Sequence, residues 1–418
     1  MRIIRDAAEK IEGNARACVF LEPLFVIPNT MYSGYMTLYM MEFGITKTQV
    51  GFVTSLNLAV ALFFALISAY ITDKLGRRRS TLVFDSIGWG LAQLVWAFAV
   101  NINFFIVAAI LNAFGRVVMN SWHCLMLEDS PPDTRIHIFT FIQVASLIGG
   151  FFAPAGALLI NRLTLVPAMR VMMIFATLSM FALFFVRNKY VAETGIGRQK
   201  MCEMKGVSVW DVFRSYMPAL KRLLKDRLLL LALFIRSLNF IQLTIRTAFI
   251  AVLVTERLGF PAEVMAVFQL ITAVVMLITL LFISPALARH TGRWPISLGL
   301  WFHIGATAVL LLSPPSQNYP LLILSAVLTA FGTSVATPRI DTLFANIIVN
   351  EDRSVVNALT SVILLLISTP FGYIGGALSG IDARLPFIFT GALFLICLLL
   401  LRVTTNMEKR RDFRQCVD

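Results

Sequence analysis

Long apolar runs separated by short polar segments repeat along the whole chain. Each run holds about 20 residues, the length that an α-helix needs to cross about 30 Å of hydrocarbon. The alternating pattern of about ten residues that marks barrel strands does not appear. We therefore predict an all-α integral membrane protein with twelve transmembrane helices, near residues 17–41, 50–72, 81–100, 103–127, 138–161, 166–187, 228–254, 263–287, 295–312, 320–346, 355–379 and 384–403.

The longest polar interval divides these spans six and six. It contains "SVWDVFRSYMPALKRLLKD", whose apolar residues recur at helical spacing with basic residues between them. Two interpretations remain open: an interfacial helix on an anionic leaflet, or a basic linker that only tethers the halves. The predicted domains are an N-terminal cytoplasmic segment (1–16), a six-helix bundle (17–187), a cytoplasmic central loop (188–227), a second six-helix bundle (228–403) and a basic cytoplasmic tail (404–418).

Composition and charge support the membrane assignment. Hydrophobic residues make up 58% of the chain and charged residues only 14%, against about 25% charged in soluble domains. The net charge of +13 reflects orientation, because about 27 of the 36 lysines and arginines fall in loops on one predicted side. We expect both termini in the cytoplasm, a cell (inner) membrane location and no nucleic-acid partner. The first residues lack a cleavable signal pattern.

Three landmarks of the first half recur in the second. "TDKLGRRR" after the second span is matched by "ARHTGRWP" after the eighth, and Gly76 and Gly292 are 216 residues apart. Pro154 and Pro370, in the fifth and eleventh spans, have the same offset, and "NAFGRVVMNSW" is echoed by "TAFGTSVATPR". Internal repeats of this size are typical of transporters.

The loop after the second span resembles the signature G-x-x-x-D-[RK]-x-G-[RK]-[RK] of the major facilitator superfamily, bacterial type. Asp73, Lys74, Gly76 and the two arginines that follow match it, whereas Ala69 replaces the leading glycine. The resemblance implies two pseudo-symmetric six-helix bundles and a loop that latches one conformation by bridging the halves. The residues of this predicted latch and of its repeat are Asp73, Gly76, Arg77, Arg78, Arg289, Gly292 and Arg293.

A weaker resemblance lies in the fifth span. "GGFFAPAG" is similar to the glycine-proline signature of antiporters in this superfamily, although Ala153 replaces the glycine before the proline. It favours export slightly, and close helix packing is the alternative explanation. Proline and glycine also predict bends or close approaches in the spans, at Pro23, Pro28, Pro154, Gly156, Pro370 and Gly372.

Charged side chains inside the apolar runs are the candidate site residues. A charge at the bilayer centre costs about 2.5–3.5 kcal/mol on insertion scales, so it is expected to face a cavity or another charge. The deep charges fall in spans 1, 4, 7 and 10, which the resemblance places along the central path. Arg339 is the weakest of the arginines because it lies off the face of Asp341. The predicted substrate and proton pathway contains Glu22, Asn29, Asn112, Arg116, Asn120, Arg236, Asn239, Gln242, Arg246 and Asp341.

These residues predict a secondary active transporter that works by alternating access. The arginines outnumber the acids, which favours an anionic or polar small-molecule substrate, and Glu22 is the candidate proton carrier. An uncoupled facilitator and a transport-inactive membrane sensor remain alternatives. An enzyme is disfavoured because no metal-ligand cluster, GxSxG turn or nucleotide loop appears. The five cysteines form no CxxC pair, so we expect no disulfide, metal or cofactor, and a functional monomer within the lipid bilayer.

Overall fold

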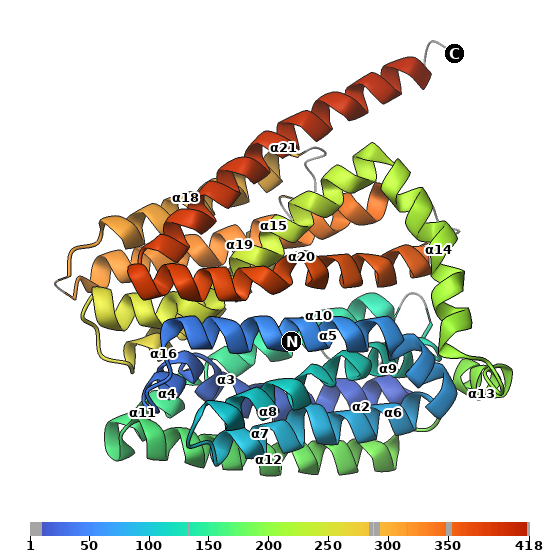
Figure 1. Cartoon of the computed structure of the whole chain (residues 1–418), viewed down its shortest axis with the longest axis horizontal. Coiled ribbons are helices and arrows are strands. Elements are labelled where there is room, and N and C mark those ends of the chain that lie inside the picture. The colour runs from blue at the N-terminus through green and yellow to red at the C-terminus, as the bar shows by residue number, and fades with distance from the viewer. Residues whose placement is uncertain are drawn as a thin grey trace. The chain divides into compact units, whose positions relative to one another are not determined.

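The computed structural model describes residues 11–131, 134–283, 287, 293–315, 317–347 and 353–415 (Figure 1). These residues form helices and connecting turns, with no strand among them. Ten helices in this part of the chain are long and apolar enough to cross a membrane. The structure confirms the predicted all-α class, and the chain is a multi-pass membrane protein.

The chain forms two compact units, Met1–Ile45 with Leu56–Arg214, and Thr46–Ser55 with Ser215–Asp418. The helix α5 (Lys47–Leu75) contributes to both units, and so does α14 (Val209–Lys225). The first unit also contains α2 (Gly13–Leu21), α3 (Pro23–Ser33), α4 (Met36–Met41), α6 (Arg77–Asp85), η1 (Ser86–Leu91), α7 (Ala92–Ala97), α8 (Ile102–Ala113), α9 (Gly115–Leu127), α10 (Arg135–Gly150), α11 (Ala153–Leu163), α12 (Leu165–Tyr190) and α13 (Gly195–Glu203). The second contains α15 (Arg227–Val252), η2 (Leu253–Arg257), α16 (Val264–Ile278), η3 (Thr279–Ile283), α18 (Trp294–Leu312), α19 (Tyr319–Ile347), α20 (Arg353–Ile381) and α21 (Leu385–Gln415).

The first and third predicted spans are interrupted helices and not continuous ones. The first consists of α2, α3 and α4, because Pro23 has no N–H to continue α2 and a turn at Gly34–Tyr35 separates α3 from α4. The third consists of α6, the π-helical segment η1 and α7. Within η1, a Cβ added to Gly88 would lie 2.7 Å from the backbone nitrogen of Gly115, so this glycine lets two spans approach closely.

The last helix continues beyond the predicted end of its span. The apolar run ends near residue 403, but α21 continues to Gln415. The residues after 403 include neither glycine nor proline, and lysine, arginine, glutamate and methionine among them are good helix formers. The predicted tail therefore begins as a helical extension of the last span.

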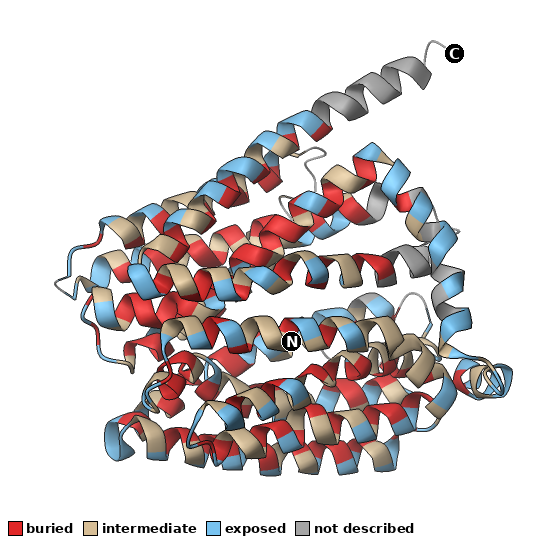
Figure 2. Cartoon of the chain, in the orientation of Figure 1, coloured by how far each residue is buried: buried red, intermediate tan, exposed pale blue. Residues whose placement is uncertain are grey.

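Burial differs between the helices of the second unit. Most residues of α15 are buried (Figure 2), whereas most of those in α16 are only partly buried. Exposed large apolar side chains recur along the spans, among them Leu178, Phe282 and Leu312. In a membrane protein such side chains contact lipid.

The beginning of α5 packs closely against α20 in the second unit. The hydroxyl of Ser55 donates a hydrogen bond to the carbonyl of Thr369 at 2.5 Å and accepts one from the backbone N–H of Tyr373 at 2.7 Å. In a regular α-helix that carbonyl and that N–H bond each other, so Ser55 inserts into one turn of α20. Lys47 also forms an ion pair with Glu256 at 2.5 Å.

Candidate functional site

Glu22 occupies the break between α2 and α3. Its carbonyl accepts hydrogen bonds from the backbone N–H groups of Phe25 and Val26 at 2.9 and 3.0 Å, and its side chain is half-buried. In the second turn of α3, Asn29 accepts a hydrogen bond from the hydroxyl of Tyr32 at 2.7 Å. Glu22 therefore directly precedes α3, which begins at Pro23, and Asn29 lies within it.

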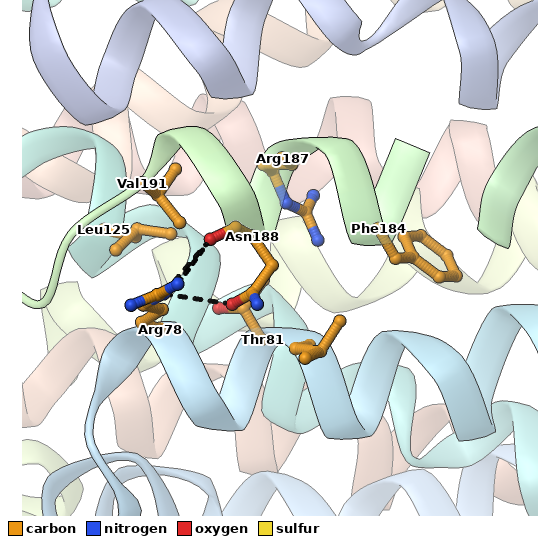
Figure 3. A pocket seen from close by; sticks show the side chains of 8 residues that line it. Arg78, Thr81, Leu125, Phe184, Arg187, Asn188 and Val191 are labelled. Atoms are coloured by element: carbon orange, nitrogen blue, oxygen red, sulfur yellow. Dashed lines mark hydrogen bonds between the residues drawn. The ribbon is translucent and has the colours of Figure 1, made fainter. Parts of the chain in front are cut away.

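A buried ion pair lies near Glu22. Arg187, near the end of α12, pairs with Asp85 at the end of α6, and both side chains are 5% exposed. Glu22 lies within electrostatic range of both partners. The guanidinium of Arg187 also lies over the ring of Phe184, 5.7 Å from its centroid (Figure 3). The guanidinium of Arg187 thus interacts with two carboxylates: it contacts Asp85 directly and attracts Glu22 at longer range.

Arg78 lies beside this pair, at a narrow hollow between α6 and α12 (Figure 3). Its guanidinium donates hydrogen bonds to the backbone carbonyl of Asn188 at 2.7 and 3.2 Å, and one to the side-chain oxygen of the same residue at 3.1 Å. These bonds connect the first turn of α6 to the end of α12.

Gly76 makes the turn between α5 and α6. Its φ of +86° is a conformation that favours glycine. An added Cβ would also lie 2.6 Å from a carboxylate oxygen of Glu193. That carboxylate accepts hydrogen bonds from the backbone N–H groups of Arg77 at 2.9 Å and Arg78 at 3.0 Å. An acid at the first N–H groups of α6 is favourably placed for the helix dipole.

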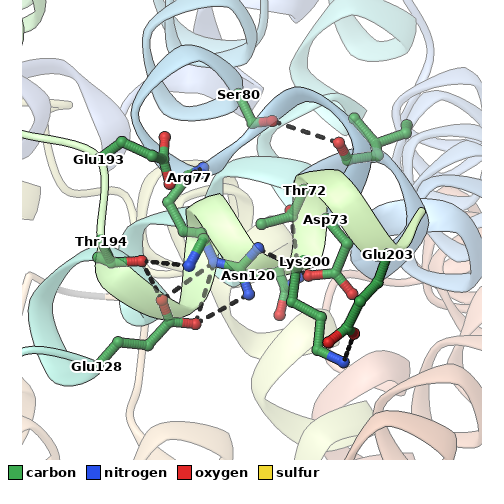
Figure 4. A network of polar contacts seen from close by, with 12 residues as sticks. Thr72, Asp73, Arg77, Ser80, Asn120, Glu128, Glu193, Thr194, Lys200 and Glu203 are labelled. Atoms are coloured by element: carbon green, nitrogen blue, oxygen red, sulfur yellow. Dashed lines mark hydrogen bonds and ion pairs between the residues drawn. The ribbon is translucent and has the colours of Figure 1, made fainter. Parts of the chain in front are cut away.

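Arg77 is the centre of a charged network at this turn (Figure 4). Its side chain is 4% exposed and forms ion pairs with Asp73 at 2.8 Å and Glu128 at 2.9 Å. Thr194 donates a hydrogen bond to the same Glu128 carboxylate. Burial acts to lower the pKa of Arg77, but the hydrogen bonds and charge of Glu128 and the charge of Asp73 outweigh it, so the pKa is raised. Arg77 and Arg78 connect this loop to Glu128, Asn188 and Glu193, which belong to the first unit.

The repeat of this loop is described only in part. Arg289 and Gly292 lie outside the described residues. Arg293 directly precedes α18, with a φ of −94° and a ψ of −2°. Its contribution to a latch stays a prediction.

The three candidate residues of the fourth span have different surroundings. Asn112 donates to the carbonyl of Gly88 at 3.0 Å, and Asn120 donates to the hydroxyl of Thr72 at 3.2 Å. Arg116 is half-buried and has no hydrogen bond or ion pair with any residue that the structure describes. The asparagines therefore hold neighbouring spans together, whereas the arginine is left unpaired.

In the second unit, Arg236 forms an ion pair with Asp341 at 2.7 Å and lies over the ring of Phe344. This contact joins α15 to α19. Asn239 on α15 donates to the hydroxyl of Thr337 on α19 at 3.5 Å, and Gln242 donates to Asn239 at 3.4 Å.

Arg246 lies further along α15 and is buried, with 7% of its surface exposed. Its guanidinium donates one hydrogen bond, to the hydroxyl of Thr329 at 2.5 Å. The structure describes no carboxylate in contact with it. His303 on α18 is also buried, stacks on Phe394 and contacts Gly332 one turn from Thr329. Arg339, by contrast, donates to the carbonyl of Val335 in its own helix at 3.0 Å.

The residues predicted to bend helices take different positions. Pro28 lies inside α3 and Pro154 in the first turn of α11, where proline is tolerated. Gly156 lies against the backbone carbonyl of Met31 in α3, and a side chain there would overlap it. Pro370 lies inside α20, which is assigned as one helix, and a Cβ on Gly372 would lie 2.8 Å from the hydroxyl oxygen of Ser55.

Sequence reasoning missed three charged residues, one in the buried ion pair with Asp85 and two that contact the turn at Gly76. Arg187, Glu128 and Glu193 lie at or just beyond the ends of apolar runs, where charge usually marks a membrane surface. Their partners are distant in sequence: Glu128 is 51 residues from Arg77 and Glu193 is 116. The one available signal was an acidic residue soon after a span, because acids contribute little to the orientation of the chain in the membrane.

Comparison with known proteins gives the family. The family model of the Major Facilitator Superfamily matches residues 24–315 and 237–415. This chain belongs to the major facilitator superfamily. No curated protein sequence matches it.

Solved structures of this superfamily fold resemble the chain at low sequence identity. The nucleoside transporter NupG, as a variant, has a TM-score of 0.71 at 13% identity, covering 94% of this chain and all (100%) of that one. A variant of the peptide transporter POT has a TM-score of 0.70 at 13% identity, with 97% and 98% covered. A bacterial homologue of the iron transporter ferroportin, in an inward-facing state, has a TM-score of 0.68 at 13% identity, with 94% and 98% covered.

The superfamily is one of transporters, so the chain is a member of a transporter family and not of an enzyme family. The described residues contain no group of three His, Cys, Asp or Glu side chains placed to hold a metal ion.

Proposed function

We propose that this protein is a secondary active transporter for an anionic or strongly polar small solute, working by alternating access and coupled to protons. The observation that carries the proposal is Arg246, a buried cation whose one described partner is a neutral hydroxyl. A buried charge without an opposite charge is costly. Arg236 on the same helix forms an ion pair with Asp341. Arg246 is therefore the proposed partner of an anionic substrate.

Arg116 supports the same substrate class from the first unit. It lies within a membrane span and has no ion pair among the described residues. Guanidinium groups bind carboxylate and phosphate groups in a bidentate geometry, which makes them well suited to anion recognition. The degraded antiporter motif around Pro154 favours export over uptake.

A ligand-stabilisation screen tests the substrate class. We expect carboxylated or phosphorylated solutes to raise the Tm of the purified protein, and neutral or cationic solutes to leave it unchanged. Arg246→Gln should abolish the shift because the proposed partner of the anion is gone. Arg402→Gln, which removes an exposed arginine of α21, is the control and should retain it. Stabilisation by neutral or cationic compounds alone would overturn the proposal. Binding without counterflow in proteoliposomes would point to a sensor.

Glu22 is the proposed proton carrier. It is half-buried in the first span, and Arg187, the one described guanidinium in its electrostatic range, is already bound by Asp85. A proton on one of the two acids would balance this group of three charges. One proton moved across 100 mV supplies about 2.3 kcal/mol to transport.

We expect Glu22→Gln to remove the dependence of transport on a pH gradient while leaving exchange of substrate for substrate intact. The amide keeps the size of the side chain but carries no titratable proton. The measurement is transport into proteoliposomes with and without an imposed pH gradient. Glu42→Gln, which removes an exposed acid after α4, is the matched control. An unchanged response to the gradient in Glu22→Gln would exclude Glu22 as the carrier.

A further inference from the structure

The helix α14 presents an exposed apolar stripe on one face. Trp210, Met217 and Leu224 recur every seven residues and so lie on one helix face. Their exposed fractions are 71%, 49% and 55%. Figure 2 shows exposed residues along this helix. Exposed apolar side chains are expected on a membrane span, but α14 contains too many charges to be one.

Basic residues lie on the same face as the apolar ones. Arg214 lies four residues after Trp210, and Lys221 lies four residues after Met217; both basic side chains are exposed. On a helix, this spacing turns each basic side chain by about 40° from the apolar side chain four residues before it. We call this face the α14 stripe: Trp210, Arg214, Met217, Lys221 and Leu224.

The other side of the helix is fixed to the second unit. Leu223 is 1% exposed and packs in a cluster with Leu229 and Leu233 of α15. One residue, Asp226, separates the two helices, and its carboxylate accepts hydrogen bonds from the first N–H groups of α15. Because α15 is a membrane span, the stripe is anchored at the end of a span, where the bilayer surface lies.

We propose that the α14 stripe binds the surface of an anionic lipid leaflet. Its apolar side chains would enter the boundary between headgroups and acyl chains, while the two basic side chains contact lipid phosphates. Amphipathic helices with tryptophan and leucine on one side and basic residues beside them bind membranes in this way. Each basic residue near an anionic surface raises the membrane-binding constant about fivefold. A protein partner is disfavoured by the position of the stripe at a span end.

The test uses Trp210 as a reporter in the full-length protein. Wild type and Trp210→Phe are reconstituted into vesicles of dibrominated phosphatidylcholine, alone or mixed with dibrominated phosphatidylglycerol, and the difference in emission gives the Trp210 signal. We expect strong quenching of that signal in the anionic vesicles and much less in the neutral ones. High salt should weaken the quenching, and so should the double variant Arg214→Gln/Lys221→Gln.

Trp301 supplies an internal control. It is 55% exposed in α18, a membrane span, so its signal, measured with Trp301→Phe, should be quenched in both kinds of vesicle. Trp210 that is unquenched in both vesicles while Trp301 is quenched would overturn the proposal. Equal quenching of Trp210 in neutral and anionic vesicles would overturn the role of the basic residues. Neither result depends on what the protein transports.

Discussion

Replacing Arg187 with alanine is expected to lower the free energy of unfolding by about 3–5 kcal/mol. Arg187 and Asp85 are each 5% exposed and pair directly with one another. Removing the arginine leaves the Asp85 carboxylate buried without its partner, and it takes from Glu22 a nearby positive charge. Thermal or denaturant unfolding of the detergent-solubilised protein measures the effect.

Two further variants separate the lost pair from lost packing. Replacing both partners by apolar residues, as in Arg187→Met/Asp85→Leu, should restore most of the stability because no buried charge is left alone. Arg79→Ala removes an exposed arginine of α6 and should change stability by less than about 0.5 kcal/mol. If the double variant is as unstable as Arg187→Ala, the guanidinium contributes through packing and the interpretation fails.

Most of the fold could be predicted from the sequence because membrane spans follow from length and hydropathy alone. The exceptions lie where backbone chemistry matters more than hydropathy. The run over 17–41 is apolar throughout, yet Pro23 ends α2 and a turn at Gly34 ends α3. The π-helical segment η1 has no hydropathy signal, and its residues Gly88 and Gly90 leave room for Gly115 and Phe181. Hydropathy cannot place the end of α21 either, since the helix continues in polar sequence.

The candidate site was less predictable than the fold. Charges within spans could be selected because they are costly there, and Arg236 and Asp341 do pair with one another. Helical spacing predicted which residues share a face of each span, but it could not predict which other segment packs against that face. For that reason Asn112 and Arg116 could not be distinguished, although Asn112 bonds Gly88 and Arg116 has no partner among the described residues. Contacts between distant segments, such as Glu193 with the start of α6, depend on packing that no local pattern encodes.

We also expect Gly51→Ala to disrupt the packing of α5 on α20. An added Cβ would lie 2.5 Å from the carbonyl oxygen of Gly372 and 2.8 Å from the Cα of Gly376, and both obstacles are backbone. Overpacking of this kind costs about 1–3 kcal/mol, which corresponds to about a 5- to 160-fold change in a two-state population. The conformation in which Ser55 bonds Thr369 should therefore lose population.

Cross-linking between α5 and η2 measures that loss. In a background without the natural cysteines, Lys47→Cys and Glu256→Cys replace an ion pair whose atoms are 2.5 Å apart, so a short bifunctional reagent should join them in high yield. Gly51→Ala should reduce the yield. Gly305→Ala is the matched control, because its Cβ would lie 3.8 Å from a side-chain carbon of Leu328, an ordinary contact. An equal cross-linking yield in the two glycine variants would contradict this prediction. It would mean that the close contact at Gly51 does not stabilise this conformation.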